Sequence, residues 1–417
     1  MISRYEQIQA LLIAKTGSDA KACQAKLEKM QISPFFFMRG SADLFYQDIA
    51  AGLLQIPESL YQLPATFIMG DCHLSNFGFF SEEGSHGDHI IFAPNDFDDA
   101  CHGPAIWDIC RFLVSIELAA ADCLDISKRM KIMSCFLSCY RKTCQHILDK
   151  KIDYYQVVTD FKKVKRLHKR YLKACRRAAF GEDFLIKSSL AKAVDLQRFP
   201  LSFKNIDGRF QRLAKEEYHA LEHTFAPYVN DTILDIVQRL DAGTGSLNML
   251  RYYLLVGPNG QINQQQLHLN HIVEIKQQRV AAPINSFPAL SPINRLNPAH
   301  LTVLSQRYMQ RNPDLILNDA IWQKQHWLIR SRHHARVSID PTDVITNDKA
   351  LKYYVKQCAI SLALAHARGD RRSNAFEQAV CDTMSKKLSS DLINSVREYC
   401  RQLVSDHRLL SEQSACY

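Results

Sequence analysis

The sequence predicts an α+β fold that is predominantly helical, with helical blocks flanking a small β-rich segment at about residues 243–340. Two observations support this. Apolar residues recur at helical spacing through most of the chain. Turn signals and β-branched or aromatic runs gather near residues 65–99 and after Asp241. With 417 residues, 47% of them hydrophobic, the chain can form two or three domains or lobes, and its composition excludes disordered, collagen-like and low-complexity proteins.

The first half of the chain contains the predicted hairpin. Residues up to about 60 have the apolar spacing of helices. Three short apolar runs follow and are expected to be strands, the last two paired across a polar turn: Ala65–Met69, Phe77–Phe80 and His89–Ala93. Gly103-Pro104 is expected to open a helix, because proline is well placed in a first turn. Residues 125–240 are expected to be almost wholly helical.

In the second half of the chain, the helical pattern gives way at Asp241 to a composition typical of turns and strands. Arg251–Val256 is expected to be a strand by composition, and Leu267–Lys276 its return strand after a glycine- and proline-bearing turn. Four prolines between residues 281 and 298 predict a loop, and the chain then returns to helix. The expected organisation is a helical lobe at 1–240, a β-rich lobe at 241–340 and C-terminal helices at 341–417 that return to the first lobe.

Cysteine usage and apolar runs predict a cytoplasmic protein. The 13 cysteines include no CxxC pair, which argues against a disulfide framework or a zinc knuckle. The longest apolar stretch, Phe112–Cys123, is interrupted by Glu117 and Asp122 and is too short to cross a bilayer. The first residues show no cleavage signal for secretion. We therefore expect no transmembrane segment and a reducing compartment.

The densest polar cluster is Gly70–Asn76, followed by a second cluster at Asn95–Asp99. Asp71 and Asn76 have the D-x-x-x-x-N spacing of a kinase catalytic loop, in which the Asp accepts a proton and the Asn binds a metal ion. Asp96 is placed across the hairpin to bind the same Mg²⁺, and Asp98 points to the same side if the backbone is extended. The alternative is that these are ordinary turn residues.

These residues resemble those of known phosphotransferases. The runs GDCHLSNFGFF and NDFDDACHGPAIWDICRF are similar to the motifs of aminoglycoside phosphotransferases and choline kinases. The resemblance implies that Asp71 is the catalytic base, that Asn76 and Asp96 bind the metal, and that Asp108 is a buried brace of the catalytic loop. His73 would hold that loop or contact substrate.

The similarity is closer still to the bacterial domain-of-unknown-function family 2252, which is related to those kinases. It covers most of the chain, and its further marks are Pro34–Gly40, Gly243–Ser246, Glu274–Lys276, Ser305–Gln310 and Ala365–Asp370. The long catalytic motifs are specific, whereas these short ones are weaker.

A second cluster completes the kinase-like pattern. Gly243, Thr244, Gly245 and Ser246 are expected to cover the phosphates of ATP, and Lys276 on the return strand to hold the α- and β-phosphates. In ordinary kinases such a segment precedes the catalytic loop, so the resemblance implies a circularly permuted, two-lobed, protein-kinase-like fold. The alternative is a simple turn into a hairpin.

Two residues of the second cluster and its surroundings depart from the family pattern. Asn248 replaces the third glycine, although Asn also tolerates left-handed backbone. His300 stands where the family usually has a Glu, so Lys276 lacks the expected partner. Glu274 shares a strand face with Lys276 and is the expected substitute, or else forms a surface salt bridge of little worth.

Several other side chains leave alternatives open. Adjacent Cys–His pairs at residues 72–73 and 101–102 lack zinc-finger spacing. His366 and Arg368 fit contacts with helix-end carbonyls as well as with phosphate. The remaining candidates for a phosphate or substrate pocket are Arg307, Arg330 and Arg332.

The net charge of +9 comes from one segment. Residues 162–177 contain nine Lys or Arg and no acid, and the rest of the chain is formally neutral. The segment fits a binding site for an anionic partner or a solvated, structural helix. This charge distribution argues against a general nucleic-acid binder.

The sequence therefore predicts an ATP- and Mg²⁺-dependent phosphotransferase that acts on a hydroxyl or amine of an unknown small molecule or protein. A catalytically inactive pseudokinase and an AMP-transferring enzyme are the alternatives. A metallophosphoesterase would share the Asp71-x-His73 pair, but its G-N-H-[DE] run is absent from the sequence.

Overall fold

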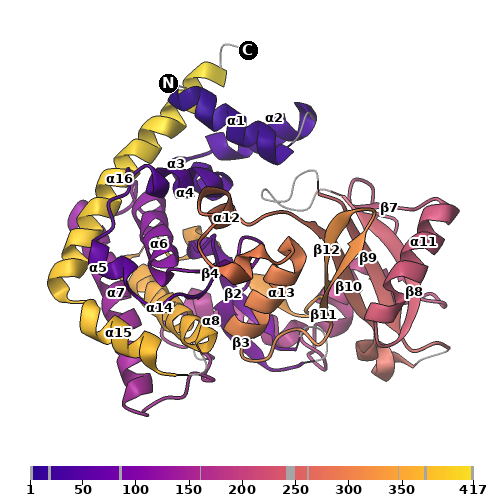
Figure 1. Cartoon of the computed structure of the whole chain (residues 1–417). Coiled ribbons are helices and arrows are strands. Elements are labelled where there is room, and N and C mark those ends of the chain that lie inside the picture. Colours follow the sequence, from indigo (N-terminus) through magenta and orange to yellow (C-terminus); the bar gives the residue numbers. More distant parts are fainter. Residues whose placement is uncertain are drawn as a thin grey trace.

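The computed structural model describes residues 3–16, 20–83, 87–159, 161–240, 249–260, 263–345, 347–370 and 373–414. Helices account for about 54% and strands for about 16%, which confirms a mixed and mostly helical structure. The largest sheet of the described residues has six strands. It lies on one side of the molecule and the long helices lie on the other (Figure 1).

The N-terminal part is helical, as predicted. It contains α1 (Arg4–Thr16), α2 (Ala20–Gln31), α3 (Pro34–Gly40), α4 (Ala42–Ala50) and α5 (Glu58–Tyr61). Helix α3 begins where its sequence directs, because the Ser33 side chain accepts a hydrogen bond from the Phe36 N–H and Pro34 occupies the first turn.

The predicted hairpin is present and carries an additional strand. Strands β2 (Phe77–Ser81) and β3 (Ile90–Pro94) pair antiparallel, and β13 (Arg336–Ser338) joins the other edge of β2. Strand β1 (Thr66–Ile68) pairs instead with β4 (Cys101–Gly103). The sequence analysis missed β4 and β13, because a strand of three residues has no readable period.

Long helices surround this hairpin and form the main core. They are α6 (Ala105–Ala119), α7 (Ile126–Leu148), α14 (Asp348–Gly369), α15 (Ala375–Thr383) and α16 (Lys386–Ser414). Helix α6 lies at the centre, where every residue except Ala119 is buried. Pro104 lies immediately before α6, close to the predicted start.

The six-stranded sheet is antiparallel in the order β11-β12-β10-β9-β8-β7. Its strands are β7 (Phe210–Gln211), β8 (Thr232–Arg239), β9 (Arg251–Gly257), β10 (His271–Gln278), β11 (Leu317–Trp322) and β12 (Gln325–Ser331). Strands β9 and β10 confirm the predicted pair. Tyr252 and Leu254 pack with α11 (Lys215–Phe225) on one face of β9, and Tyr253 and Leu255 pack on the other, so this strand is apolar throughout.

The prediction that residues 125–240 are almost wholly helical is wrong. Strand β8 lies in that range, although its apolar residues Ile233, Leu234, Ile236 and Val237 have helical spacing. A register shift between Ile233 and Asp235 interrupts the regular alternation of the strand. The remaining strands of the range are β7 and the short pair β5 (Val194–Asp195) and β6 (Ser202–Phe203).

The other described elements are short, apart from α8 and α13. They are α8 (Lys165–Arg177), α9 (Phe184–Lys187), α10 (Ser189–Ala193), η2 (Ala226–Tyr228), η3 (Gln264–Leu269), α12 (Ala282–Ser286), η4 (Pro292–Arg295), α13 (Pro298–Met309) and η5 (Pro341–Asp343). The predicted loop at 281–298 thus contains α12 and η4.

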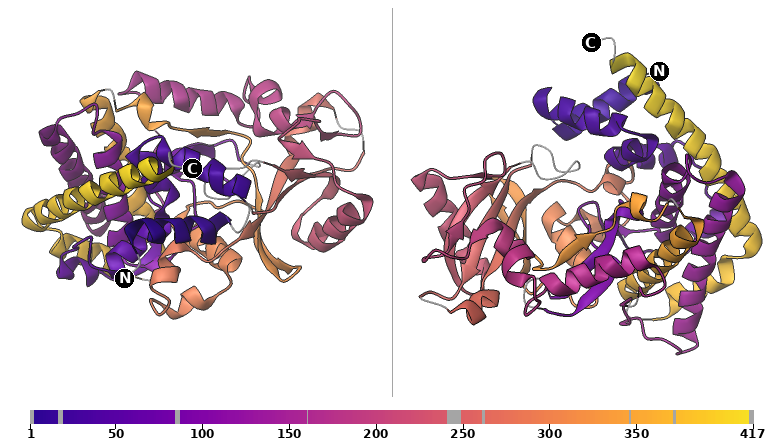
Figure 2. Two further views of the ribbon diagram at one scale, coloured as in Figure 1. Left: turned by 90° about the horizontal axis from the view of Figure 1, so that it is seen from above. Right: turned by 180° about the vertical axis from the view of Figure 1, so that it is seen from behind.

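Helix α8 carries the basic segment on the outside of the molecule (Figure 2). Its buried residues, Leu167 and Ala174, lie two turns apart on one face. Among its cations, Arg170 forms an ion pair with Asp343 at 2.8 Å. One face of α8 is therefore structural.

Helix α1 lies against the last helix, α16 (Figure 2). The Arg4 guanidinium donates to Asp48 at 2.7 Å and to Asp406 at 2.7 Å, and both carboxylates are buried. Tyr399 also donates to Asp48 at 2.8 Å. Two buried acids thus depend on one arginine from the start of the chain.

Within the described ranges, no helix has both the length and the apolar character needed to cross a membrane.

Glu377 on α15 generates a prediction about pH. Its side chain is buried, Oε2 has no hydrogen-bond partner among the described residues, and burial with the nearby charge of Asp370 raises its pKa to about 7. Because the folded state then binds the proton more tightly, the stabilising contribution is complete below the usual pKa of 4.5 and is lost as the pH rises toward 7. Glu377→Gln should therefore become more stable relative to wild type across this window. Urea unfolding at several pH values measures this, and a constant difference would contradict it.

Candidate active site

The segment Gly70–Asn76 connects β1 to β2. Gly70 has a φ of 72°, and a Cβ at this position would collide with the backbone carbonyl of Asp99. Glycine is therefore required for the loop to pack against the second polar cluster. The loop ends in one turn of 3₁₀ helix, η1 (Leu74–Asn76), which the His73 ring caps by accepting from the Ser75 N–H at 3.2 Å.

Asp108 on α6 braces the start of this loop. Its two carboxylate oxygens accept from the Met69 N–H at 2.7 Å and the Gly70 N–H at 3.0 Å. His366 on α14 contacts the same carboxylate at 3.1 Å, and its other ring nitrogen bonds the Tyr140 hydroxyl at 2.6 Å. The brace implied by the family resemblance is therefore present in the structure.

Asp71 follows the braced residues and is held by an arginine. Arg111 Nε donates to Asp71 Oδ1 at 2.6 Å, and His73 Nε2 lies 3.6 Å from Oδ2. Burial acts to raise the pKa of the Asp71 carboxyl, but the positive charge of Arg111 outweighs burial and holds it well below its usual value. Burial lowers the pKa of His73. The carboxylate keeps 23% exposure, so a ligand can still reach it.

Asn76 links the loop to the second polar cluster. Its Nδ2 donates to the Asp71 backbone carbonyl at 2.9 Å, and the backbone carbonyl of Asn76 accepts from the Asn95 N–H at 3.1 Å. Because the amide nitrogen is used in this way, the amide oxygen is the atom left to bind a cation.

Asp96 and Asp98 follow β3 and lie close together. The Asp98 N–H donates to Asp96 Oδ1 at 3.4 Å. Burial and the charge of Asp98 raise the pKa of Asp96 to about 6. The Asp98 carboxylate forms an ion pair with Lys276 and accepts from Gln278 at 3.1 Å. Burial acts to raise the pKa of Asp98, but Lys276 holds it well below its usual value.

Lys276 is therefore brought to the second polar cluster, although 178 residues separate it from Asp98. Its side chain is buried on β10, and burial lowers its pKa against the effect of Asp98. The acid that pairs with Lys276 is thus Asp98, two residues after Asp96.

Glu274 has neither of its expected roles. It is fully buried and forms ion pairs with Arg251 at 3.2 Å, Arg330 at 2.9 Å and Arg332 at 2.8 Å. Burial acts to raise the pKa of Glu274, but the three arginines hold it well below its usual value. The alternative prediction, a salt bridge at the surface, is wrong because Glu274 is buried.

The other candidate side chains have partners within the chain. His300 pairs with Asp319 at 2.8 Å. Arg307 donates to the Leu317 carbonyl at 2.6 Å, and Arg368 donates to the carbonyl of Met309, the last residue of α13, at 2.7 Å. Both arginines hold backbone carbonyls in place, and the carbonyl that Arg368 contacts lies at a helix end, which is one of the two alternatives expected for it.

The predicted glycine-rich segment lies outside the described residues. This applies to Gly243, Thr244, Gly245, Ser246 and Asn248.

Two arginines near the loop were missed as site residues. Arg111 lies one turn after Asp108 on the same face of α6, which is a readable signal once Asp108 is assigned. Arg39 on α3 lies near Asp71 and Asp96, whose charges oppose the lowering of its pKa by burial. The Pro34–Gly40 motif contains Arg39, but nothing in its pattern shows where the side chain points.

Where the structure is described, no three His, Cys, Asp or Glu side chains gather into a metal site. The candidate cation site consists of two carboxylates and one amide, from Asp96, Asp98 and Asn76.

Comparison with known proteins identifies the family. Residues 18–413 match a bacterial family described as "Uncharacterized protein conserved in bacteria (DUF2252)". The chain belongs to this family. No curated protein and no solved structure matches the chain significantly. Membership in DUF2252 confirms the family resemblance, and the relationship to phosphotransferases stays a prediction.

Asp108 generates a prediction about stability. Asp108→Asn keeps the size of the side chain but sets an amide N–H against the backbone donors of Met69 and Gly70. We expect the free energy of unfolding to fall by about 3 kcal/mol. The exposed Asp382→Asn serves as the control and should change it by less than about 0.5 kcal/mol. Equal effects in urea unfolding would contradict the role of Asp108.

Proposed function

We propose that the chain is an ATP- and Mg²⁺-dependent phosphotransferase acting on a hydroxyl or amine of a small molecule or protein. The observation that carries the proposal is the Lys276–Asp98 ion pair, which joins β10 to the polar cluster that also contacts the catalytic loop. A braced loop with Asp71 and Asn76, two further acids and a buried lysine are the groups that phosphoryl transfer requires.

Asp71 is proposed as the base. Arg111 keeps this carboxylate ionised, so it can accept the proton of an attacking hydroxyl or amine. The Asp108 brace and Arg111 both come from α6, so one rigid helix fixes the loop and the carboxylate together. Such positioning is the main contribution that a protein makes to this chemistry.

The cation and nucleotide fit the remaining groups. Asn76 and Asp96 offer the hard oxygen ligands that Mg²⁺ prefers, and the other ligands would be phosphate oxygens and water. Lys276 would hold the α- and β-phosphates, with Asp98 supporting it through their ion pair. Bound ATP would supply the phosphoryl group and Mg²⁺ would neutralise its charge.

The proposed architecture is a two-lobed, kinase-like fold with its lobes in permuted order. It is supported by a lysine on a central strand of an antiparallel sheet that faces a catalytic loop earlier in the chain. We also propose that the protein acts in the cytoplasm, as its cysteine usage suggests.

Nucleotide binding is tested by thermal unfolding with ATP and Mg²⁺. At a hundredfold excess over Kd, the nucleotide should stabilise the wild type by about 2.7 kcal/mol. Asp96→Asn should lose the Mg²⁺-dependent part of this stabilisation, whereas Asp382→Asn should keep it. A wild type that shows no response at saturating ATP refutes the proposal.

Transfer is tested with ATP labelled in the γ- or the α-phosphate. Asp71→Asn should still bind ATP but transfer label about 10²- to 10⁴-fold more slowly. Movement of the γ-label supports a phosphotransferase, and movement of the α-label identifies AMP transfer instead. Binding without movement of either label indicates a pseudokinase.

A further inference from the structure

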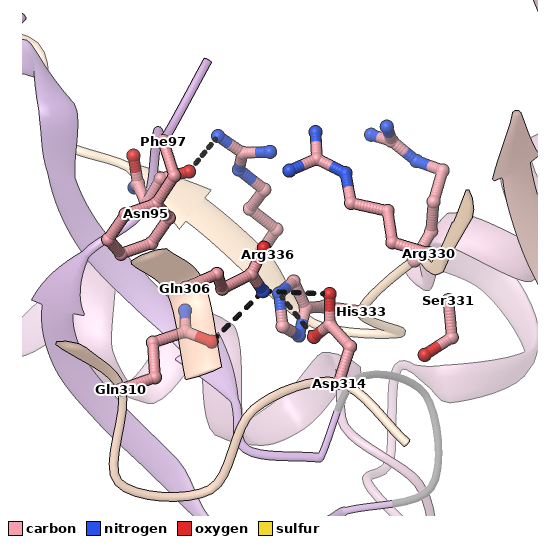
Figure 3. Close-up of a pocket in the computed structure, with 10 residues that line it drawn as sticks. Asn95, Phe97, Gln306, Gln310, Asp314, Arg330, Ser331, His333 and Arg336 are labelled. Atoms are coloured by element: carbon pink, nitrogen blue, oxygen red, sulfur yellow. Dashed lines mark hydrogen bonds and ion pairs between the residues drawn. The ribbon is translucent and has the colours of Figure 1, made fainter. Parts of the chain in front are cut away.

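A polar pocket between the six-stranded and the three-stranded sheet contains several arginines (Figure 3). Arg330 and Arg332 share the carboxylate of Glu274, and the walls that include Arg336 also include the acid Asp314. The charge of this pocket is therefore offset by acids of the protein itself. A larger unbalanced positive charge lies at the surface, on and beside α8.

The chain from the start of α8 to residue 206 has a large excess of positive charge. Residues 165–206 contain 11 Lys or Arg against three Asp or Glu, a net charge of +8. All three acids pair with cations of the same segment. The pairs are Glu182 with Arg176, Asp183 with Arg176 and Lys187, and Asp195 with Arg198. A net charge of +7 remains once Asp343, the partner of Arg170, is counted.

Cations from several elements lie close together here. Burial and nearby cations, Arg177 and Lys187 among them, lower the pKa of Lys173 on α8. Burial and the positive charges of Arg177, Lys173 and Arg209 lower the pKa of Lys192 on α10. Arg177 Nε is buried and has no hydrogen-bond partner among the described residues. The surface around the end of α8 therefore carries a positive field that attracts anions.

Large apolar side chains protrude beside these cations. Ile186 on α9 is 70% exposed and Phe199 is 48% exposed, and both line one open hollow together with Leu185. Leu185 also lines an adjoining hollow whose walls include Lys204. Lys187 follows Ile186 directly in the chain and acts on Lys173 through its charge. Apolar and cationic side chains thus occur together on this surface.

We propose that this surface binds an anionic lipid bilayer. We call it the basic–apolar surface, and it consists of Lys173, Arg177, Lys192, Leu185, Ile186 and Phe199. The cations would be attracted to anionic head groups, and the apolar side chains would enter the boundary between head groups and acyl chains. Since no helix within the described ranges is able to cross a membrane, the protein would lie on the bilayer.

The exposed aliphatic side chains favour a lipid partner over a nucleic acid. Both partners offer negative charge, but nucleic acids are bound through phosphate contacts and through bases that stack on aromatic rings. Neither contact covers Leu185 and Ile186, whereas acyl chains do. The inference goes beyond the proposed transfer reaction and does not depend on it.

The role of the cations is tested by flotation of the full chain with lipid vesicles. The wild type should float with vesicles of equal parts phosphatidylcholine and phosphatidylglycerol, and not with phosphatidylcholine alone. The double variant Lys173→Glu/Lys192→Glu should weaken the affinity for the anionic vesicles about tenfold or more. Because these lysines are repelled by their neighbours, the folded state should not be destabilised. Lys386→Glu/Lys387→Glu makes the same change of net charge on α16 and should retain binding.

The role of the apolar side chains is tested with Ile186→Ser. The side chain is exposed, so stability should change little, while the affinity for anionic vesicles should fall about threefold to tenfold. Ile321→Ser on β11 removes a side chain that is equally bare, at 66% exposure, and should bind as the wild type does.

Three results would overturn the proposal. The first is a wild type that does not float with anionic vesicles or floats equally well with neutral ones. The second is binding that the lysine variant weakens but Ile186→Ser leaves unchanged, because charge alone would then explain it. The third is tighter binding of single-stranded RNA than of the anionic vesicles, which would identify a nucleic acid as the partner. Stabilisation by ATP should be the same in Ile186→Ser and wild type, so the proposed function is judged separately.

Discussion

The buried carboxylate of Asp108 is the constraint on which the rest of the site depends. It joins α6, the loop after β1 and His366 of α14, and the residues that contact it lie 38 to 258 positions from Asp108 in the chain. A charge in this position is tolerated only while all of its donors are present, so the three segments must assemble together. Arg111, one turn further along α6, then fixes Asp71. The geometry of the loop is thus set by one helix that is itself almost completely buried.

A second set of charges connects the six-stranded sheet to the polar cluster after β3. Lys276 reaches Asp98, while Glu274 on the same strand gathers arginines from β9, β12 and the residue after it. Strand β10 therefore directs Lys276 toward Asp98, while Glu274 on the same strand pairs with arginines. Because three arginines already pair with Glu274, it does not compete with Asp98 for the lysine.

The local parts of the site could be predicted from the sequence, and the distant parts could not. Asp71, Asn76, Asp96 and Asp98 lie within 28 residues of one another and carry a recognisable spacing. Arg336 becomes part of a pocket only because β13 pairs with β2, a contact between residues about 250 apart that leaves no pattern in either segment. The same holds for the elements of the fold. The long helices were correctly predicted, whereas β8 was predicted to be helix because its apolar residues have helical spacing.

The contacts of Arg4 have a consequence for biosynthesis. The ribosome releases the chain from its N-terminus, and Asp406 is made 402 residues after Arg4. Until then Arg4 has one of its two carboxylates, and Asp48 lacks the hydroxyl of Tyr399. The charges of α1 are therefore fully paired only after α16 has been synthesised. A chain interrupted late in translation would expose an unfinished N-terminal surface, which is a feature that quality-control chaperones and proteases are able to detect.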